Sequence, residues 1–289
     1  MKKEKKMEIN RNLIAQLEQK LDGMSKAHRK IAECIIEDPE RIDNMSISEL
    51  AEACNVGCAT ISRFCSKMNL QGYLGLKVAL FNYKDVEQGE ELLLPKAREE
   101  EALSADSLLD KFTTALKKTE ESLNRQTVRE VAELLKQARR ITFYGMGNSH
   151  FSATMGFNKF FRGLPNVKMV PEGQLQFVSA SLSNEGDVAL IVSYSGATKE
   201  SVELARIVKS RGAKVVCISH YEKSPISAFT DYILLNGGEE KYVNTPSLVE
   251  QTCTMYIFEV LYTAYAKENK EQVRINEALS SRILLDKVF

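Results

Sequence analysis

The chain has 289 residues, 44% of them hydrophobic, and its 39 Lys and Arg residues balance its 39 Asp and Glu residues. With only 15 Gly and 6 Pro, this composition excludes a disordered or low-complexity protein, and the length is sufficient for two globular domains. No apolar run approaches the roughly 20 residues of a membrane-spanning helix, and the basic residues 1–6 lack the apolar core of a signal peptide. We therefore expect a cytoplasmic protein without a membrane partner.

The first domain, residues 1–84, is predicted to be all-α. Apolar periodicity predicts helices over residues 11–21, 25–37, 48–54, 58–68 and 73–83. Ser25 is a predicted N-cap, and Pro39 follows the end of the second helix. The third and fourth helices are short and are joined by the turn 55–57, which is the arrangement of a helix-turn-helix.

The residues of this motif have distinct physical roles. Ala51 is small enough to let the two helices cross closely, and Asn55 tolerates a left-handed backbone in the turn. Ile61 and Phe64 are predicted to point inward. The outward face of the second helix then carries the predicted DNA contacts Ala59, Thr60, Ser62, Arg63 and Lys67.

The charge distribution supports DNA as the partner of this domain. Residues 53–84 contain no acidic side chain, while Arg63, Lys67, Lys77 and Lys84 are basic. A phosphate backbone selects a local cationic surface of this kind. The alternative is an ordinary helical hairpin in which Arg63 only solvates the surface.

A strongly acidic stretch follows the first domain. Residues 85–110 carry nine acidic side chains against two basic ones, and they include Pro95. We interpret residues 85–107 as an exposed linker and residues 108–289 as the second domain.

The six cysteines do not indicate a metal site. Cys54, Cys58 and Cys65 form a cluster, but no histidine lies near enough in the sequence to complete zinc ligation. We expect reduced thiols, no metal and no cofactor.

The second domain alternates apolar strands with helical segments, which predicts an α/β fold with a parallel sheet. Strands are predicted over residues 140–144, 166–170, 187–193, 214–219 and 231–235. Helices are predicted over residues 150–162, 199–210 and 246–268.

The loop Ser193-Tyr194-Ser195-Gly196-Ala197-Thr198 lies between a buried strand and a helix. Unpaired N–H groups and the helix dipole at such a turn attract an anion, and Gly196 lets the backbone approach it closely. An uncharged, hydroxyl-rich loop suits a phosphate monoester. The alternative is that Thr198 only caps the helix and the serines only form a turn.

A second loop, Gly145-Met146-Gly147-Asn148-Ser149, follows another predicted strand. If the two strands are neighbours in a parallel sheet, both loops face one ligand at the carboxyl edge. A nicotinamide site is not predicted, because His150 occupies the third glycine position of the dinucleotide motif.

Over about residues 10–285 the chain resembles the RpiR-type family of bacterial transcription regulators. The resemblance rests on residues 45–51, residues 59–67, Gly72-Tyr73 with Leu76-Lys77, and the two loops. It implies an N-terminal helix-turn-helix and a C-terminal sugar isomerase (SIS) domain with a flavodoxin-like five-stranded parallel sheet. It also implies operator binding as a homodimer or homotetramer, controlled by a sugar phosphate effector, in sugar or amino-sugar catabolism.

The resemblance also implies site residues. The family's phosphosugar loops match Gly147, Asn148, Ser149, Ser193, Ser195, Gly196 and Thr198. A glutamate in the final helix is the base in related isomerases, so Glu250 is a candidate ligand contact or, alternatively, a surface charge. His220 follows the fourth strand and is a candidate contact to sugar hydroxyls, and Tyr73 joins the predicted DNA contacts.

One departure from the family lies in the turn of the helix-turn-helix. The family usually has Gly and then Ser around the valine, whereas this chain has Asn55 and Gly57. Both residues suit the geometry, but a Ser hydroxyl that can touch DNA is absent.

Three classes of function stay open: a ligand-responsive DNA-binding regulator, a sugar-phosphate isomerase with an accessory helical domain, and an adaptor that dimerises through the SIS fold. Isomerisation needs a base beside the sugar and a group that opens the ring. No histidine follows His220, and Glu259 is the only acid besides Glu250 between residues 246 and 265. We therefore favour the regulator and predict no catalytic residue.

Overall fold

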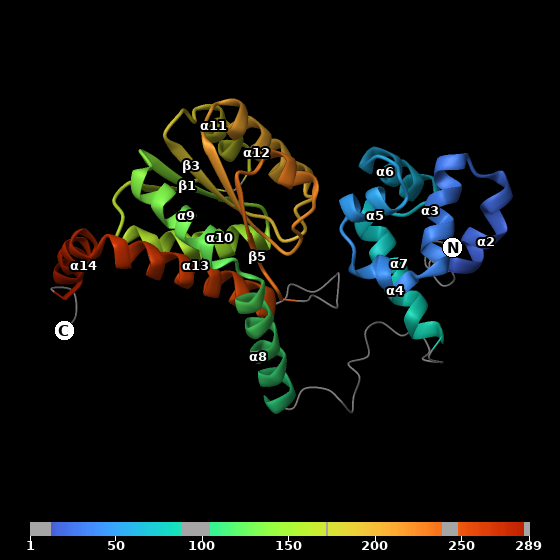
Figure 1. Cartoon of the computed structure of the whole chain (residues 1–289), viewed down its shortest axis with the longest axis horizontal. Coiled ribbons are helices and arrows are strands. Elements are labelled where there is room, and N and C mark those ends of the chain that lie inside the picture. Colours follow the sequence, from blue (N-terminus) through green and yellow to red (C-terminus); the bar gives the residue numbers. More distant parts are fainter. Residues whose placement is uncertain (1–12, 88–104, 172, 239–247, 286–289) are drawn as a thin grey trace. The chain divides into compact units, whose positions relative to one another are not determined.

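The computed structural model describes residues 13–87, 105–171, 173–238 and 248–285. Contacts divide the chain into two compact units that part between Ser107 and Leu108. Figure 1 shows the first as a group of helices and the second as a sheet covered by helices. None of the helices within the described residues is long and apolar enough to cross a membrane.

Unit 1 is helical, as predicted. Its elements are α2 (Leu13–Lys20), the 3-10 helix η1 (Leu21–Gly23), α3 (Lys26–Glu37), α4 (Pro39–Asn44), α5 (Ile47–Ala53), α6 (Cys58–Lys67) and α7 (Gly72–Glu87). Ser25 caps α3 through a hydrogen bond from the His28 backbone N–H. Pro39 follows α3 and also begins α4, a helix that the sequence did not predict.

Helices α5 and α6 form the helix-turn-helix. The Ser46 hydroxyl accepts from the Glu49 N–H and the Glu49 carboxylate accepts from the Ser46 N–H, so a capping box starts α5. Asn55 adopts the left-handed conformation expected of the turn, with a φ of 51°. Gly57 is the N-cap of α6 and supplies no side-chain hydrogen bond.

The predicted linker overlaps the ends of two helices. Helix α7 continues to Glu87, and α8 begins at Ala105, so the predicted boundaries 85 and 107 both lie inside helices. The remaining linker residues, 88–104, lie outside the described residues.

Unit 2 contains a five-stranded sheet, and every paired strand is parallel. The strands are β1 (Arg140–Gly145), β2 (Val167–Met169), β3 (Asp187–Val192), β4 (Lys214–Ser219) and β5 (Tyr232–Leu235). Their order, β2-β1-β3-β4-β5, is the flavodoxin-like order and confirms the predicted fold class. Strand β3 ends one residue before the predicted limit, which places Ser193 in the following loop.

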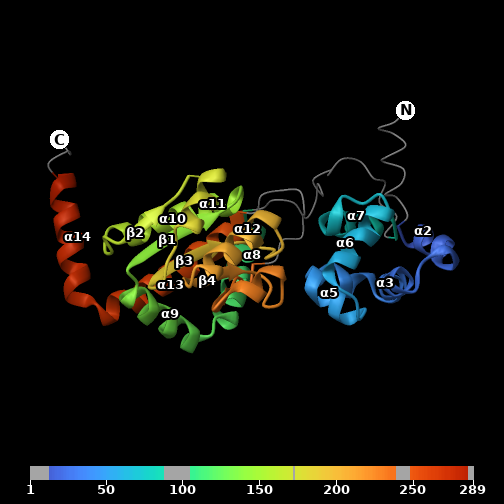
Figure 2. The same ribbon diagram turned by 90° about the horizontal axis from the view of Figure 1, so that it is seen from above.

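Helices cover both faces of this sheet (Figures 1 and 2). The helical elements of the unit are α8 (Ala105–Ser122), α9 (Arg125–Gln137), α10 (Asn148–Phe161), α11 (Gln174–Ser181), α12 (Lys199–Ser210), the 3-10 helix η2 (Pro225–Phe229), α13 (Leu248–Glu268) and α14 (Lys270–Leu285). Side chains of β1 and β3 alternate between two cores, one with α9, α10 and α13 and the other with α11 and α12. Helix α12 has the predicted bounds, whereas α10 starts two residues early, and residues 246–247 of the predicted final helix lie outside the described residues.

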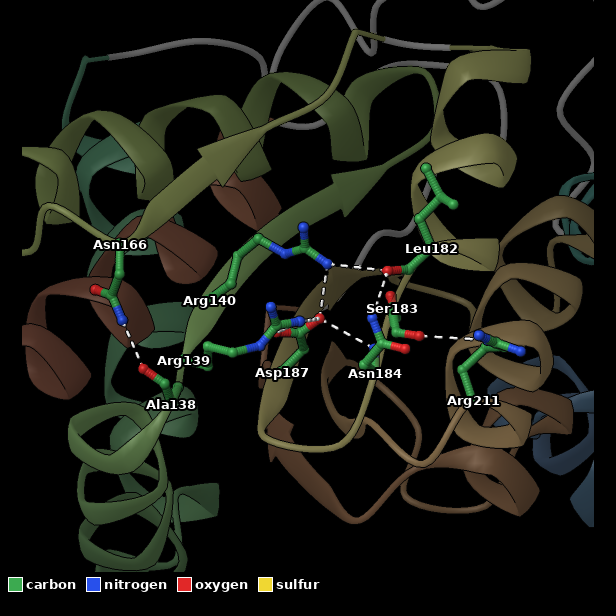
Figure 3. A network of polar contacts seen from close by, with 9 residues as sticks. All are labelled: Ala138, Arg139, Arg140, Asn166, Leu182, Ser183, Asn184, Asp187 and Arg211. Atoms are coloured by element: carbon green, nitrogen blue, oxygen red, sulfur yellow. Dashed lines mark hydrogen bonds and ion pairs between the residues drawn. The ribbon is translucent and has the colours of Figure 1, made fainter.

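An ion-pair network fixes the amino edge of the sheet. Arg139 and Arg140 point toward the carboxylate of Asp187, each within 2.8 Å (Figure 3). The backbone N–H of Asn184 donates to the same carboxylate at 3.0 Å. Because the Asp187 side chain is only 3% exposed, this network holds β3 beside β1 from within the protein.

Candidate functional site

Two loops leave the carboxyl edge of the sheet side by side. Gly145, the last residue of β1, is opposite Val192, the last residue of β3. Residues 146–149 and 193–198 therefore start from adjacent positions, as expected at the switch point of a flavodoxin-like sheet. This is the arrangement that the sequence predicted for one shared ligand.

The loop after β3 is shaped by its own backbone. Ser193 donates its N–H to Ile218, and the Gly196 N–H returns to the Ser193 carbonyl, both at 3.0 Å. Gly196 has a φ of 59°, and a Cβ atom there would lie 2.1 Å from the Ser224 hydroxyl. Only glycine fits this position, because a side chain would be strained by both the backbone and the contact.

The hydroxyl groups of Ser195 and Thr198 differ in their hydrogen bonds. Thr198 is the N-cap of α12, yet its side chain makes no capping hydrogen bond. The Ser195 hydroxyl accepts from the Ala197 N–H at 3.2 Å, which orients it within the loop. Thr198 thus caps α12 by its position and not through its side chain, and the Ser195 bond is that of a turn, so the alternative from the sequence stays open.

Two buried hydroxyls lack partners among the described residues: Ser193 Oγ and Ser224 Oγ. Their residues are only 2% and 3% exposed. An unsatisfied buried hydroxyl is unfavourable in a folded protein, so each calls for a ligand or a water molecule as partner. The sequence prediction missed Ser224, because it reaches the loop from the segment after β4.

The loop after β1 is held from a neighbouring helix. Gly147 has a φ of 56°, which favours glycine, and it is followed by Asn148 and Ser149 in the first turn of α10. The fully buried Gln176 amide of α11 donates to the Gly145 carbonyl at 3.0 Å and lies 3.3 Å from His150 Nδ1. Gln176 was not predicted, since nothing in its local sequence marks it.

His220 reaches the edge of the same region. The backbone N–H of His220 donates to the Tyr194 carbonyl at 2.9 Å, and the imidazole stacks on the Tyr194 ring with centroids 5.0 Å apart. Its Nδ1–H donates to the Asn236 carbonyl at 2.8 Å, which sets the orientation of the imidazole. A cavity of about 240 Å³ lies beside it, lined by Lys118, Glu121, Ser122, His220, Leu235, Asn236 and Gly237.

Glu250 lies near this end of the sheet but does not line that cavity. It is in the first turn of α13, and its backbone carbonyl accepts from the Asn236 amide at 3.0 Å. The other acid considered, Glu259, forms an ion pair with Lys159 at 2.8 Å on the outside of unit 2. The structure therefore brings His220 to the Ser193–Thr198 loop and leaves the role of Glu250 untested.

In unit 1 the predicted DNA contacts occupy one side of α6. Ala59, Ser62, Arg63 and Lys67 are exposed and Thr60 is half-buried, while the opposite side of α6 is buried. Tyr73 is only half-exposed, and its hydroxyl donates to the Met45 carbonyl at 2.9 Å. That bond ties α7 to the start of α5, so Tyr73 has a structural role beside the predicted one.

The cysteines are free thiols distributed over both units. Burial raises the pKa of the Cys65 and Cys217 thiols to about 12, which keeps them protonated and unreactive near neutral pH. Within the described residues no group of three or more His, Cys, Asp or Glu side chains is placed to hold a metal ion.

Comparisons with known proteins identify both units. The helix-turn-helix domain of the rpiR family matches residues 11–85, and the SIS domain matches residues 134–264. The HTH-type transcriptional regulator HexR of Pseudomonas aeruginosa is 31% identical over 208 residues, which cover 71% of this chain and 72% of that protein. The HTH-type transcriptional regulator RpiR of Escherichia coli is 28% identical over 267 residues, covering 91% of this chain and 89% of that protein.

A solved structure shares the fold of both units. The Vibrio vulnificus NanR protein complexed with ManNAc-6P has a TM-score of 0.82 at 22% identity, covering 96% of this chain and 99% of that one. The two family matches thus define a transcriptional regulator that combines a helix-turn-helix with an SIS domain. The chain belongs to the RpiR family of HTH-type transcriptional regulators.

Proposed function

We propose that the chain binds operator DNA through α6 and that a sugar phosphate in the SIS domain controls this binding. The observation that carries the proposal is the Ser193 hydroxyl, buried at the switch point without a partner among the described residues. A phosphate oxygen supplies the missing acceptor, since phosphates accept strong hydrogen bonds from hydroxyl and backbone donors.

The phosphate-binding residues proposed are Gly147, Asn148, Ser149, Ser193, Ser195, Gly196 and Thr198. Ser224 joins them, because its unsatisfied hydroxyl lies against Gly196. His220 and, more distantly, Glu250 are proposed contacts of the sugar. NanR in complex with ManNAc-6P, a sugar phosphate, supports this class of effector.

DNA contact is proposed for Ala59, Thr60, Ser62, Arg63, Lys67 and Tyr73. Residues 1–84 then serve as the DNA-binding domain, 85–107 as the linker and 108–289 as the effector domain. A regulator of this kind acts where the DNA is, in the bacterial cytoplasm, and we propose that it governs sugar or amino-sugar catabolism.

Sensing is favoured over catalysis. A ketose–aldose isomerase requires a base beside the sugar and a group that opens the ring. Glu259 forms an ion pair with Lys159. The His220 ring is oriented by the backbone carbonyl of Asn236 rather than by a carboxylate. An isomerase with an accessory domain remains the second candidate, because Glu250 lies in the first turn of α13 close to Gly238.

A panel of sugar phosphates and the matching unphosphorylated sugars separates these functions. We expect at least one sugar phosphate to raise the melting temperature of the full chain, because a ligand that binds the folded state stabilises it by mass action. The unphosphorylated sugar should not, and no isomerised product should form. Product formation would establish the isomerase, whereas a panel without any thermal shift would leave the SIS fold as a dimerising module.

A further inference from the structure

We propose that a backbone phosphate of the bound DNA sits in a groove between the α2–α3 turn and the C-terminal end of α6, where Lys20, His28 and Lys67 hold it. This inference rests on the proposed DNA binding and deepens it. It extends the contact surface from α6 and Tyr73 of α7 to the α2–α3 turn, which no motif of the sequence indicated.

The groove is a defined feature of unit 1. Its volume is about 310 Å³, and the cationic or titratable side chains that line it are Lys20, His28 and Lys67. Met24, Phe64 and Met68 form its apolar walls. The His28 ring contacts the Phe64 ring edge to face, with centroids 5.6 Å apart, so the imidazole is held in place rather than free in solvent.

The groove continues the predicted DNA-contacting side of α6. Lys67 belongs both to the exposed side that carries Ser62 and Arg63 and to the lining of the groove. The protein therefore offers a DNA strand that contacts Arg63 a second position for a phosphate, one helical turn further along α6. In related docking geometries, backbone contacts beside the recognition helix fix its register in the groove of the DNA.

The charges that surround His28 favour an anion. None of the residues lining the groove is acidic. Asp22 of η1 is fully exposed and lies 4.0 Å from Arg29. Glu40 and Arg41 belong to α4, which follows the C-terminal end of α3, whereas His28 lies near the N-terminal end of α3. Glu18 of α2 is exposed and does not line the groove.

The electrostatics of the free protein agree with this position. Burial lowers the pKa of His28, and the ammonium group of Lys67 lowers it further. His28 is therefore uncharged near neutral pH in the free chain. A bound phosphate offsets the charge of Lys67 and raises the pKa of His28, so DNA binding takes up a proton and strengthens as the pH falls.

The test uses the full chain and a duplex that the wild-type protein selects from a random-sequence pool. The variants are Lys20→Gln and His28→Gln, with Arg63→Gln as reference and Lys111→Gln, an exposed lysine of α8, as the control with the same charge change. The dissociation constant is measured against salt concentration at two pH values, and the melting temperature of each variant confirms folding.

We expect Lys20→Gln to reduce the slope of log Kd against log salt by about one relative to the wild type, the value for one lost phosphate contact. His28→Gln should remove the strengthening at low pH, and Lys111→Gln should match the wild type in both respects. If Lys20→Gln and His28→Gln behave like Lys111→Gln while Arg63→Gln weakens binding, the groove is not a phosphate site and DNA binding stands. If no duplex is selected, the proposed function itself fails.

Discussion

At the residue scale, the most informative groups are the buried serines at the carboxyl edge of the sheet. The buried Ser193 hydroxyl makes no hydrogen bond to any described residue. Gly196 has a backbone conformation that only glycine adopts without strain. Such local costs are typical of functional sites, where the ligand supplies what the fold leaves unsatisfied.

Ser193→Ala separates stability from ligand binding. In the free protein the change removes an unsatisfied buried hydroxyl, so the free energy of unfolding should stay constant or rise. Affinity for the sugar phosphate that gives the largest thermal shift should fall about tenfold or more, because a hydrogen bond to a charged group contributes about 1.5–3 kcal/mol. Urea unfolding and calorimetric titration measure the two effects.

The control is Ser210→Ala at the C-terminal end of α12, whose hydroxyl bonds to the Ile207 carbonyl. It should leave affinity unchanged. Equal affinity of Ser193→Ala and the wild type would show that the Ser193 hydroxyl does not bind the phosphate.

The sequence predicted the loop residues but not their supports. Ser195, Gly196 and Thr198 were proposed because hydroxyls and glycine concentrate between an apolar strand and a helix. Gln176 and Ser224 were missed, since both reach the loops from other elements. Only the packing of α11 and η2 against the strands brings them there, and a single sequence carries no signal of that contact.

At the element scale, each end of every strand was predicted to within one residue. Continuous apolar runs mark buried parallel strands, and their limits are set by polar residues such as Asp187. The sequence analysis did not predict α4, α8, α9, α11 and α14. Helix α4 has only six residues, and α14 packs through Val273 at its N-terminal end, so neither shows a long apolar stripe.

Asp187→Ala tests the ion-pair network at the amino edge. The substitution removes the carboxylate that accepts hydrogen bonds from Arg139, Arg140 and the Asn184 N–H. Part of the positive charge of the two arginines is then left without a partner. Breaking a buried pair destabilises strongly, but Arg139 is 58% exposed, so we expect a loss of about 2 kcal/mol in unfolding free energy.

Sugar phosphate affinity should not change in the folded fraction of Asp187→Ala, because this network lies at the opposite edge from the two loops. Glu203→Ala, which breaks the exposed pair with Arg206, should have no measurable effect on stability. A variant of Asp187 as stable as the wild type would mean that the network does not hold β3 in place.

At the scale of the whole molecule, the two units differ in how much apolar surface they expose. Among the described residues, the exposed large hydrophobic side chains lie in unit 2, with Leu74 as the exception. Exposed apolar side chains that form a contiguous surface mark an association site, and a helix-turn-helix needs a second copy to read a two-fold operator. We therefore expect unit 2 to carry self-association.

Sedimentation measures this directly. The full chain and the fragment 108–289 should both form a homodimer or homotetramer at micromolar concentration, because the association surface lies in unit 2. A fragment that sediments as a monomer while the full chain is a dimer would move the interface to unit 1.

The central claim is that the ligand loop and the DNA-binding helix are coupled. The most direct measurement is the affinity of the full chain for its selected duplex, with and without the sugar phosphate, in the wild type and in Ser195→Asp. The added carboxylate repels the phosphate, so the variant should bind DNA normally and lose the ligand response, whereas Ser210→Asp should keep it. A normal ligand-dependent change in DNA affinity in Ser195→Asp would contradict the account.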